Sequence, residues 1–154
     1  MKLIKSSEIY PIALKYFEHW QTIFEKEFPN SVFEHIGSTA IKGALTKGDI
    51  DFYLEVEASQ HKQVINRLLE LGFSIKPDTH RDKNLCMVNN DDFAIQVVSK
   101  GSKYEFFKHF RDKIIHDPNS LKQYNALKLS AKNLSEEEYR EIKSAFIESL
   151  LKPP

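Results

Sequence analysis

Apolar residues recur every three or four positions in the first part of the chain, a spacing typical of a helix that packs on a core. The pattern predicts a helix from Glu8 to Phe28, with Ser6 and Ser7 as capping residues and Pro29 after its end. The side chains expected on its buried stripe are those of Ile12, Tyr16, Trp20, Ile23 and Phe24.

Between Asp49 and Val56 the spacing changes to strict alternation, and this segment is the clearest strand of the chain. One face of the strand would carry Ile50, Phe52, Leu54 and Val56, and the other Asp49, Asp51, Tyr53 and Glu55. A shorter strand is predicted from Ser31 to Ile36. The loop between the two strands contains Gly37, Gly43 and Gly48, so backbone freedom is concentrated there.

The middle of the chain predicts a helix from Ser59 to Leu71 that ends at Gly72, followed by a brief strand at 73–75. Residues 84–88 and 93–98 are expected to pair as a hairpin. The pattern then becomes helical, with helices predicted at 103–116, 118–133 and 135–151. Pro118 suits the first turn of its helix, and Ser135 with Glu138 forms a capping box.

Strands dominate up to residue 98 and helices follow, which is typical of the α+β class. Residues 1–100 would form an α/β core, and residues 101–154 a helical segment packed on that core. The sequence contains no internal repeat and no long linker, so we expect a single compact unit.

Composition narrows the class of protein. The 154 residues are 41% hydrophobic and 29% charged, as in a soluble globular domain. Lys plus Arg number 22 and Asp plus Glu also number 22, so a nucleic-acid partner is not favoured. No apolar run is long enough for a membrane helix, and a cytoplasmic location is expected. The lone cysteine, Cys86, is interpreted as a small buried hydrophobe.

The segment that best indicates a chemical function runs from Gly37-Ser38 to Asp49-Ile50-Asp51. Alternation along a strand places Asp49 and Asp51 on one face, roughly 7 Å apart at their Cα atoms. Two such carboxylates repel each other without a cation, and their oxygens suit Mg²⁺ that also binds a substrate phosphate. Upstream, Gly37 lets the backbone approach a ligand, and the Ser38 and Thr39 hydroxyls can donate to phosphate oxygens.

A bare Asp-x-Asp on a strand is more often a solvated face, and a Gly-Ser pair alone is weak evidence. In combination, hydrophobic-Gly-Ser followed by Asp-hydrophobic-Asp-hydrophobic resembles the signature of the nucleotidyltransferase fold. DNA polymerase β-like enzymes and aminoglycoside nucleotidyltransferases share that fold.

The segment Glu34-His35-Ile36-Gly37-Ser38-Thr39-Ala40, with Gly43, Lys47 and Asp51, is similar to the hallmark of the GrpB family. The second half of the chain also resembles that family, at Phe110-Arg111-Asp112, Asp117-Pro118, Tyr124, Leu127-Lys128, Tyr139, Lys143 and Phe146-Ile147. The resemblance implies a minimal nucleotidyltransferase-type mixed β-sheet with helices packed on one face, followed by a C-terminal helical part.

Two departures from the family pattern bear on activity. Asp49 stands where many members carry Ile or Val, and it restores the Asp-x-Asp of active nucleotidyltransferases. Gln96 stands where the family carries a histidine, and the third carboxylate of active enzymes has no counterpart on this strand. An amide oxygen can bind a ligand, but it cannot act as a base.

The first hypothesis is a Mg²⁺-dependent transfer of a nucleoside monophosphate from ATP or another nucleoside triphosphate to a small-molecule acceptor. Asp49 and Asp51 would hold the metal, and Ser38 and Thr39 would position the β- and γ-phosphates. Further candidates for phosphate binding are Lys47, Arg111, Lys128 and Lys143, with His35 and Gln96 as accessory candidates.

Two alternatives stay open. A non-catalytic nucleotide- or metabolite-binding module would keep the phosphate loop and lack a third ligand, as Gln96 suggests. An adaptor would use the C-terminal helices to bind a protein partner. For single residues, a packed histidine is the simpler role for His35, and core packing is the simpler role for Tyr124 and Tyr139.

Overall fold

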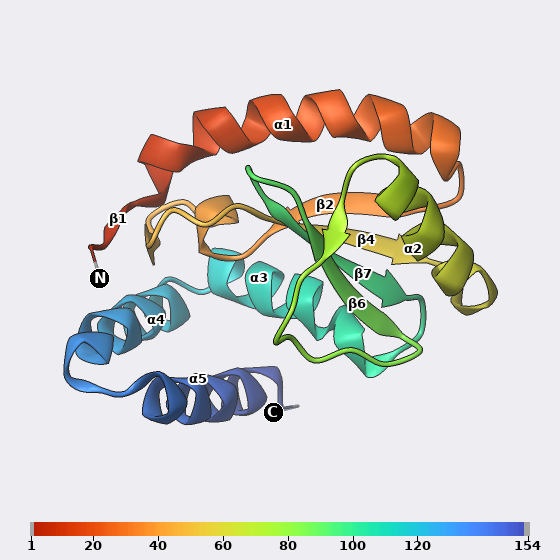
Figure 1. Cartoon of the computed structure of the whole chain (residues 1–154). Helices are drawn as coiled ribbons and strands as arrows, with labels where there is room; N and C mark the ends of the chain where they lie inside the picture. Colours follow the sequence, from red (N-terminus) through yellow and green to blue (C-terminus); the bar gives the residue numbers. More distant parts are fainter. Residues whose placement is uncertain (1, 153–154) are drawn as a thin grey trace.

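The computed structural model describes residues 2–152, and a five-stranded mixed sheet lies at its centre (Figure 1). The strand order is β2-β4-β7-β6-β5, where β4 and β7 are parallel and the other neighbours are antiparallel. The strands are β2 (Val32–Ile36), β4 (Asp51–Val56), β5 (Ser74–Ile75), β6 (Leu85–Asn89) and β7 (Ala94–Ser99). The α+β class predicted from the sequence is confirmed.

One face of the sheet is covered by α1 (Ser6–Glu27) and α2 (His61–Glu70). The predicted apolar face of β4, with Ile50 just before the strand, is buried there. Aromatic rings from α1 and β2 interlock above it, and the rings of Phe17 and Phe33 stack with centroids 4.9 Å apart. This layer is the main hydrophobic core.

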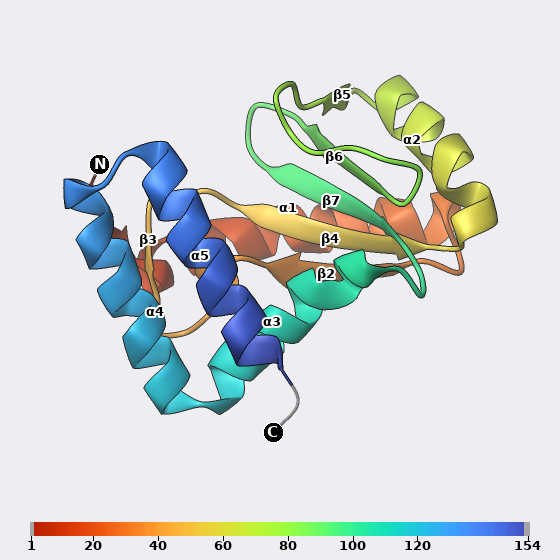
Figure 2. The same cartoon turned by 90° about the horizontal axis from the view of Figure 1, so that it is seen from below.

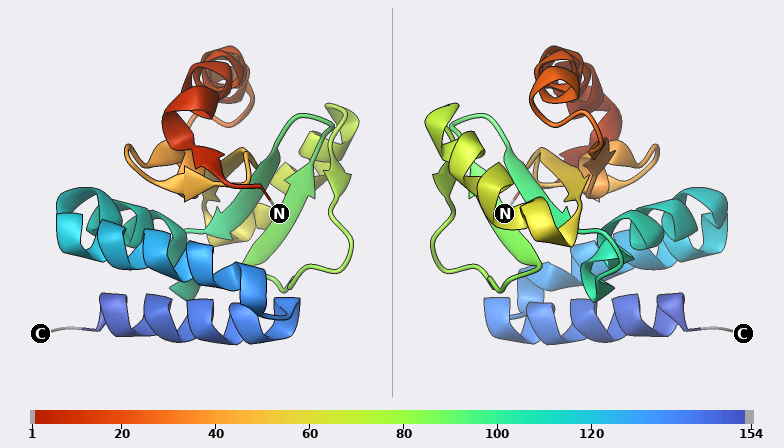
Figure 3. Two further views of the ribbon diagram at one scale, coloured as in Figure 1. Left: turned by 90° about the vertical axis from the view of Figure 1, so that its left-hand side faces the viewer. Right: turned by 90° about the vertical axis from the view of Figure 1, so that its right-hand side faces the viewer.

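The C-terminal helices lie on the opposite face (Figures 2 and 3). They are α3 (Phe106–His116), α4 (Pro118–Ser130) and α5 (Glu136–Leu151). Because α3 covers this face, Tyr53 is fully buried and Glu55 is 6% exposed. The alternation of β4 correctly predicted its core face, but its second face is also covered, which alternation alone does not indicate.

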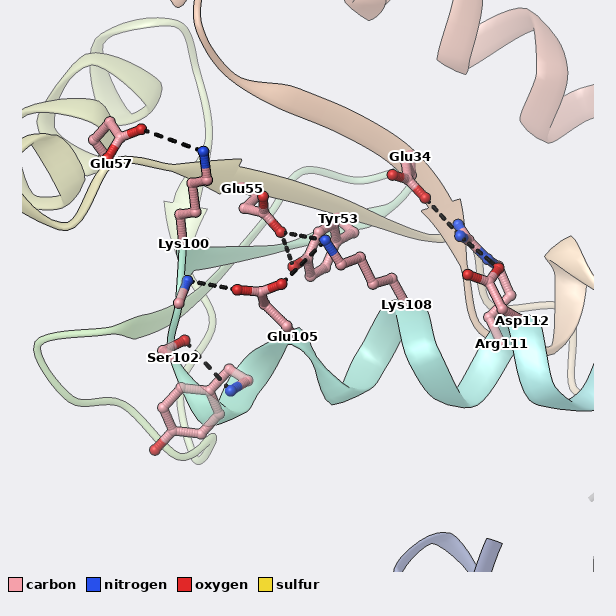
Figure 4. Close-up of polar contacts among 12 residues, drawn as sticks. Glu34, Tyr53, Glu55, Glu57, Lys100, Ser102, Glu105, Lys108, Arg111 and Asp112 are labelled. Carbon is pink, nitrogen blue, oxygen red and sulfur yellow. Dashed lines mark hydrogen bonds and ion pairs between the residues drawn. The ribbon is translucent and has the colours of Figure 1, made fainter. Parts of the chain in front are cut away.

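Figure 4 shows the polar contacts through which α3 is docked on the sheet. The Tyr53 hydroxyl donates to Glu55 Oε1 over 2.7 Å, and Lys108 Nζ donates to the same oxygen over 2.8 Å. Lys108 also lies 3.1 Å from Glu105. A buried carboxylate is therefore matched by an ammonium group from the helix above it.

A second, two-stranded sheet joins β1 (Ile4–Lys5) to β3 (Leu45–Thr46). Strands of two residues carry no detectable alternation, so the sequence did not predict them. The other side of β3 is held by α4, because Asn125 accepts from the Leu45 N–H and donates to the Gly43 carbonyl. Both edges of β3 are thus bound, which fixes the loop that follows β2.

Several sequence-based boundaries need correction. Ser6 lies inside α1, and its hydroxyl donates to the Ile41 carbonyl instead of capping the helix. Ile12 is 47% exposed and lies outside the buried stripe. β4 begins at Asp51 instead of Asp49, because β2 ends at Ile36, the pairing partner of Asp51. The predicted start of α4 at Pro118, on the other hand, is confirmed.

The capping box of Ser135 and Glu138 is confirmed as well. Gly72 has a φ of 104° just after α2, as its predicted role at the helix end requires. Within residues 2–152, no helix has the length and apolar character needed to cross a membrane.

Candidate functional site

A cleft of about 360 Å³ lies at the end of the sheet where β4 begins, between the loops around that strand and the helices α4 and α5. Such a volume is at the lower end of the range for small-molecule pockets. Seven of the residues proposed from the sequence line it: Gly37, Ser38, Lys47, Asp49, Asp51, Lys128 and Lys143. Segments about a hundred residues apart in the chain therefore meet at one cavity.

The floor of the cleft is formed where the chain turns after β2. Gly37 has a φ of 76°, and a Cβ atom at this position would lie 3.1 Å from Asp51 Oδ2. A side chain there would be strained and would press on the carboxylate, so glycine is required. Thr46 joins the two loops of the floor, because its Oγ1 accepts from Ser38 Oγ over 2.8 Å and from the Gly48 N–H over 3.0 Å.

The two aspartates differ in environment. The Asp49 side chain is 75% exposed and lies 3.9 Å from the Lys47 ammonium. Burial, and then the negative charge of Asp49, raises the pKa of Asp51 to about 6. Within residues 2–152, no N–H or O–H group donates to the Asp51 carboxylate, and no ion pair includes it. This largely buried carboxylate thus faces the cleft without a donor.

Cationic groups close the other side of the cleft. Lys128 Nζ donates to the Leu45 carbonyl over 2.7 Å and lies 4.5 Å from the ring centroid of Tyr124. Burial, and then the charges of Lys143 and Lys47, lowers the pKa of Lys128 to about 7. Burial also lowers the pKa of Lys143. An anion bound between these lysines would relieve their mutual repulsion.

Two of the predicted residues lie beside the cleft, Thr39 buried and His35 partly buried. Thr39 is fully buried and does not line the cavity, and its hydroxyl is 2.9 Å from His35 Nε2. His35 lies on the α1 side of β2, with its ring 5.4 Å from that of Phe52. Burial, and then the charge of Arg111, lowers the pKa of His35 to about 4. His35 is thus a neutral, packed histidine at pH 7.

Arg111 and Gln96 also lie outside the cleft. Arg111 is bound to the edge of β2, where it donates to Glu34 Oε1 over 2.5 Å (Figure 4). It also donates to the His35 carbonyl over 2.9 Å. Its guanidinium also pairs with Asp112. Gln96 is paired with Tyr53, two pairs beyond the Asp51–Ala94 pair at the start of the parallel ladder. Neither residue is brought to the candidate phosphate loop.

The cleft also contains residues to which the sequence analysis gave no functional role. Tyr124 and Tyr139 line it; Tyr124 is only 3% exposed and packs in the core with Ile114, as helical spacing predicted, whereas Tyr139 is partly exposed. Thr46 is among the lining residues too, as are Leu3 and the segment from Leu134 to Glu136. The glycine-rich loop was the one signal near Thr46. No local pattern placed the tyrosines at the cleft, because their positions depend on where α4 and α5 pack.

The chemistry of the carboxylates fits a divalent cation of the Mg²⁺ type. Mg²⁺ is commonly held by one or two carboxylates together with oxygens of a substrate phosphate and water. Asp49 and Asp51 supply that number, and the donor-free carboxylate of Asp51 faces the cavity. Among residues 2–152, no group of three or more His, Cys, Asp or Glu side chains could hold a metal alone.

Comparison with known proteins shows the family of the chain. The family model described as GrpB protein matches residues 11–153. The chain belongs to the GrpB family. A UPF0157 protein of Vibrio cholerae is 38% identical over 154 residues, which cover 98% of this chain and 82% of that protein. The crystal structure of a conserved GrpB protein from Enterococcus faecalis superimposes with a TM-score of 0.72 at 19% identity, covering 97% of this chain and 94% of that chain.

The GrpB fold of this chain also resembles that of a nucleotidyltransferase. Cid1 poly(U) polymerase, in a crystal structure with MgGTP bound, matches with a TM-score of 0.57 at 14% identity. The match covers 84% of this chain and 44% of the Cid1 chain. The nucleotidyltransferase-type fold inferred from the Gly-Ser and Asp-x-Asp motifs is therefore confirmed.

Proposed function

We propose that this GrpB protein is a Mg²⁺-dependent nucleotidyltransferase that transfers a nucleoside monophosphate to a small-molecule acceptor. One observation carries the proposal: the Gly37-Ser38 turn, the Asp49/Asp51 pair and the lysines of the C-terminal helices line the same cleft. These are the groups that the chemistry needs, namely metal ligands, phosphate donors and cations for the leaving group.

In this reaction, an acceptor oxygen would form a bond to the α-phosphorus, the bond to the bridging oxygen would break, and pyrophosphate and a proton would leave. Mg²⁺, when bound by Asp49 and Asp51, would neutralise charge on the phosphates. The Gly37-Ser38 turn would orient the β- and γ-phosphates through its backbone N–H groups, because the bond from Ser38 to Thr46 fixes the turn at the floor of the cleft. Lys47, Lys128 and Lys143 would bind the pyrophosphate oxygens.

Arg111 and Thr39 would act indirectly in this scheme. Arg111 braces the strand that leads into the phosphate loop, through its bond to the His35 carbonyl. Thr39 is bound to His35 at the start of the loop. Tyr139, which is partly exposed, would offer aromatic surface to the nucleoside or the acceptor. The cytoplasmic location expected from the sequence stays a prediction.

A second candidate function is a binding module of the same fold that does not turn over its ligand. Gln96 favours it, because no carboxylate from β7 accompanies Asp51. Ala94, the direct neighbour of Asp51 in the ladder, has no polar side chain either. Both candidates predict nucleotide binding in the cleft, and they differ in whether pyrophosphate is released.

Titration calorimetry with the four nucleoside triphosphates, with and without Mg²⁺, tests the proposal. We expect Mg²⁺-dependent binding to the native protein and none to the double variant Asp49→Asn, Asp51→Asn. The matched control is Asp91→Asn, Asp92→Asn, which removes two exposed carboxylates of the β6–β7 turn and should bind as the native protein does. Absence of binding to the native protein would reject both candidates.

Pyrophosphate release separates the two candidates. With binding established, the native protein is incubated with Mg²⁺, the bound nucleotide and a panel of small hydroxyl-bearing and phosphorylated acceptors. Transfer predicts acceptor-dependent pyrophosphate that the double variant does not produce. Binding without pyrophosphate across the panel would favour the non-catalytic module.

A further inference from the structure

A second hollow lies at the end of the sheet opposite the cleft. It encloses about 560 Å³ between the start of α2 and the loop that precedes β6. The parallel strands β4 and β7 begin beside the cleft and end, at Val56 and Ser99, on the side of this hollow.

Unpaired cations surround the hollow. Lys62 from α2, and Arg81 and Lys83 from the loop, line it. All three are exposed, and none forms an ion pair with a carboxylate within residues 2–152, whereas Arg67 and Lys108 each form two and Lys100 forms one. Lys62 also stands in the first turn of α2, where the helix dipole disfavours a cation. Three cationic side chains and a helix N-terminus thus line one concave surface, a combination that favours an anion there.

Asp82 is the one carboxylate among the described residues that line the hollow, and it is bound elsewhere. It accepts from the Tyr104 hydroxyl, from the Asn84 N–H over 2.8 Å, and from His80 over 3.3 Å. The Tyr104 hydroxyl bond is the main cause that lowers the pKa of Asp82 to about 2. Asp82 therefore fixes the loop that carries Arg81 and Lys83, and its carboxylate is not free to pair with them.

We propose that this hollow binds the phosphate group of a small phosphorylated molecule. The Arg81 guanidinium can hold two phosphate oxygens at once, and Lys62 and Lys83 supply further charge. Ser59 and Asn66 line the same hollow, and no hydrogen bond within residues 2–152 engages either side chain. A small ligand is favoured over a nucleic acid, because the cations gather at one concave site and the protein has no net charge.

NMR titration of the native protein with inorganic phosphate and with a sugar phosphate, at constant ionic strength, tests the site. We expect saturable shifts of the backbone amides at 58–62 and 81–83, and roughly tenfold weaker affinity in the Arg81→Gln, Lys83→Gln variant, as expected for the loss of charged donors. Lys15→Gln, Lys26→Gln is the matched control, since it removes two exposed lysines of α1. Tighter binding of the sugar phosphate than of phosphate would identify an ester as the ligand, and equal binding a free phosphate.

The proposal is overturned if the amides at 58–62 and 81–83 do not move, or if chloride at equal ionic strength moves them as far. It is also overturned if a single-stranded oligonucleotide shifts these amides while phosphate and the sugar phosphate do not. Shifts confined to residues 37–49 would report on the cleft alone. The two sites are thus distinguished residue by residue, and failure at the hollow leaves the proposed transferase untouched.

Discussion

At the scale of single residues, the packing around His35 lowers the pKa of its ring well below the usual value for histidine. Its ring packs between Tyr10 and Phe52, and its Nε2 is 2.9 Å from the Thr39 hydroxyl. The Arg111 guanidinium, bound to the His35 carbonyl, adds a positive charge nearby. Protonation of the ring would place a second cation in this packed site, so the pKa of His35 is lowered to about 4.

His35 makes the stability of the protein sensitive to acid. The folded protein binds the His35 proton more weakly than the unfolded chain does. The contribution of neutral His35 to the free energy of unfolding is therefore fully present above about pH 6.5, and it is lost as the pH falls toward 4. We expect the free energy of unfolding to fall by up to about 3 kcal/mol over this interval through His35 alone. Urea denaturation of the native protein and of His35→Gln at several pH values measures the difference.

The exposed histidine of α1 provides the control. His19→Gln should keep the acid sensitivity of the native protein, because His19 is exposed. The loss of stability between pH 6.5 and 4 should be smaller in His35→Gln than in either of the other two proteins. Equal pH dependence in all three would show that His35 is not the buried, neutral group inferred here.

At the scale of elements, the docking of α3 on β4 depends on one buried ion pair. Lys108 is 20% exposed and Glu55 is 7% exposed at the side chain, with 2.8 Å between Nζ and Oε1. Removing one partner of such a pair leaves an unmatched charge, at a cost of about 3 kcal/mol. We therefore expect Lys108→Met to lower the free energy of unfolding by about that amount, as measured by urea denaturation.

Two further variants test the cause of that loss. Adding Glu55→Gln to Lys108→Met should recover much of the stability, because the unmatched carboxylate is gone. Lys100→Met, which removes a partner of Glu57 in an exposed pair 3.9 Å long, should change stability by less than about 0.5 kcal/mol (Figure 4). A double variant less stable than Lys108→Met would contradict the assignment of the loss to the buried charge.

Elements set by local patterns could be predicted from the sequence, and those set by distant partners could not. The apolar face of β4 and the capping box at Ser135 depend on neighbouring residues, and both are confirmed. The burial of Glu55 depends on Lys108, 53 positions away, so alternation along the strand could not indicate it. The two-residue strands β1 and β3 are held by tertiary contacts that leave no periodic signal.

The same distinction applies to the candidate site. Gly37, Asp49 and Asp51 could be proposed because a turn and a strand bring them together over a short stretch of chain. Lys128 and Lys143 came from the family resemblance, and the packing of α4 and α5 brings them to the cleft. Arg111 came from the same resemblance, but its charge is matched by Glu34, 77 positions earlier, at the edge of β2. Residue type alone does not distinguish a ligand-binding cation from a structural one.

At the scale of the whole molecule, the cleft exists only where the sheet and the C-terminal helices meet. α3 buries one face of the sheet, and α4 holds the candidate phosphate loop at Leu45 through Asn125 and Lys128. The views of Figure 3 show α1, the sheet and the C-terminal helices as successive layers. A boundary near residue 100 would therefore divide the candidate site between two parts that support each other.

This mutual support predicts that the chain unfolds in one cooperative step. Trp20, the single tryptophan, packs on Phe73 and Phe93 and reports on the layer of α1 and the sheet. Far-UV circular dichroism reports on all helices, including α4 and α5. We expect both signals to give one urea midpoint in the native protein.

In Asn125→Ala both midpoints should move together to a lower urea concentration. The free energy of unfolding should fall by about 1 to 2 kcal/mol, because two contacts with the backbone are lost. Asn119→Ala, an exposed change in the same helix, should leave the midpoint near its native value. Loss of helical signal before the Trp20 fluorescence changes would show that the C-terminal helices separate first, and the cleft would then be a site that assembles between two independently stable parts.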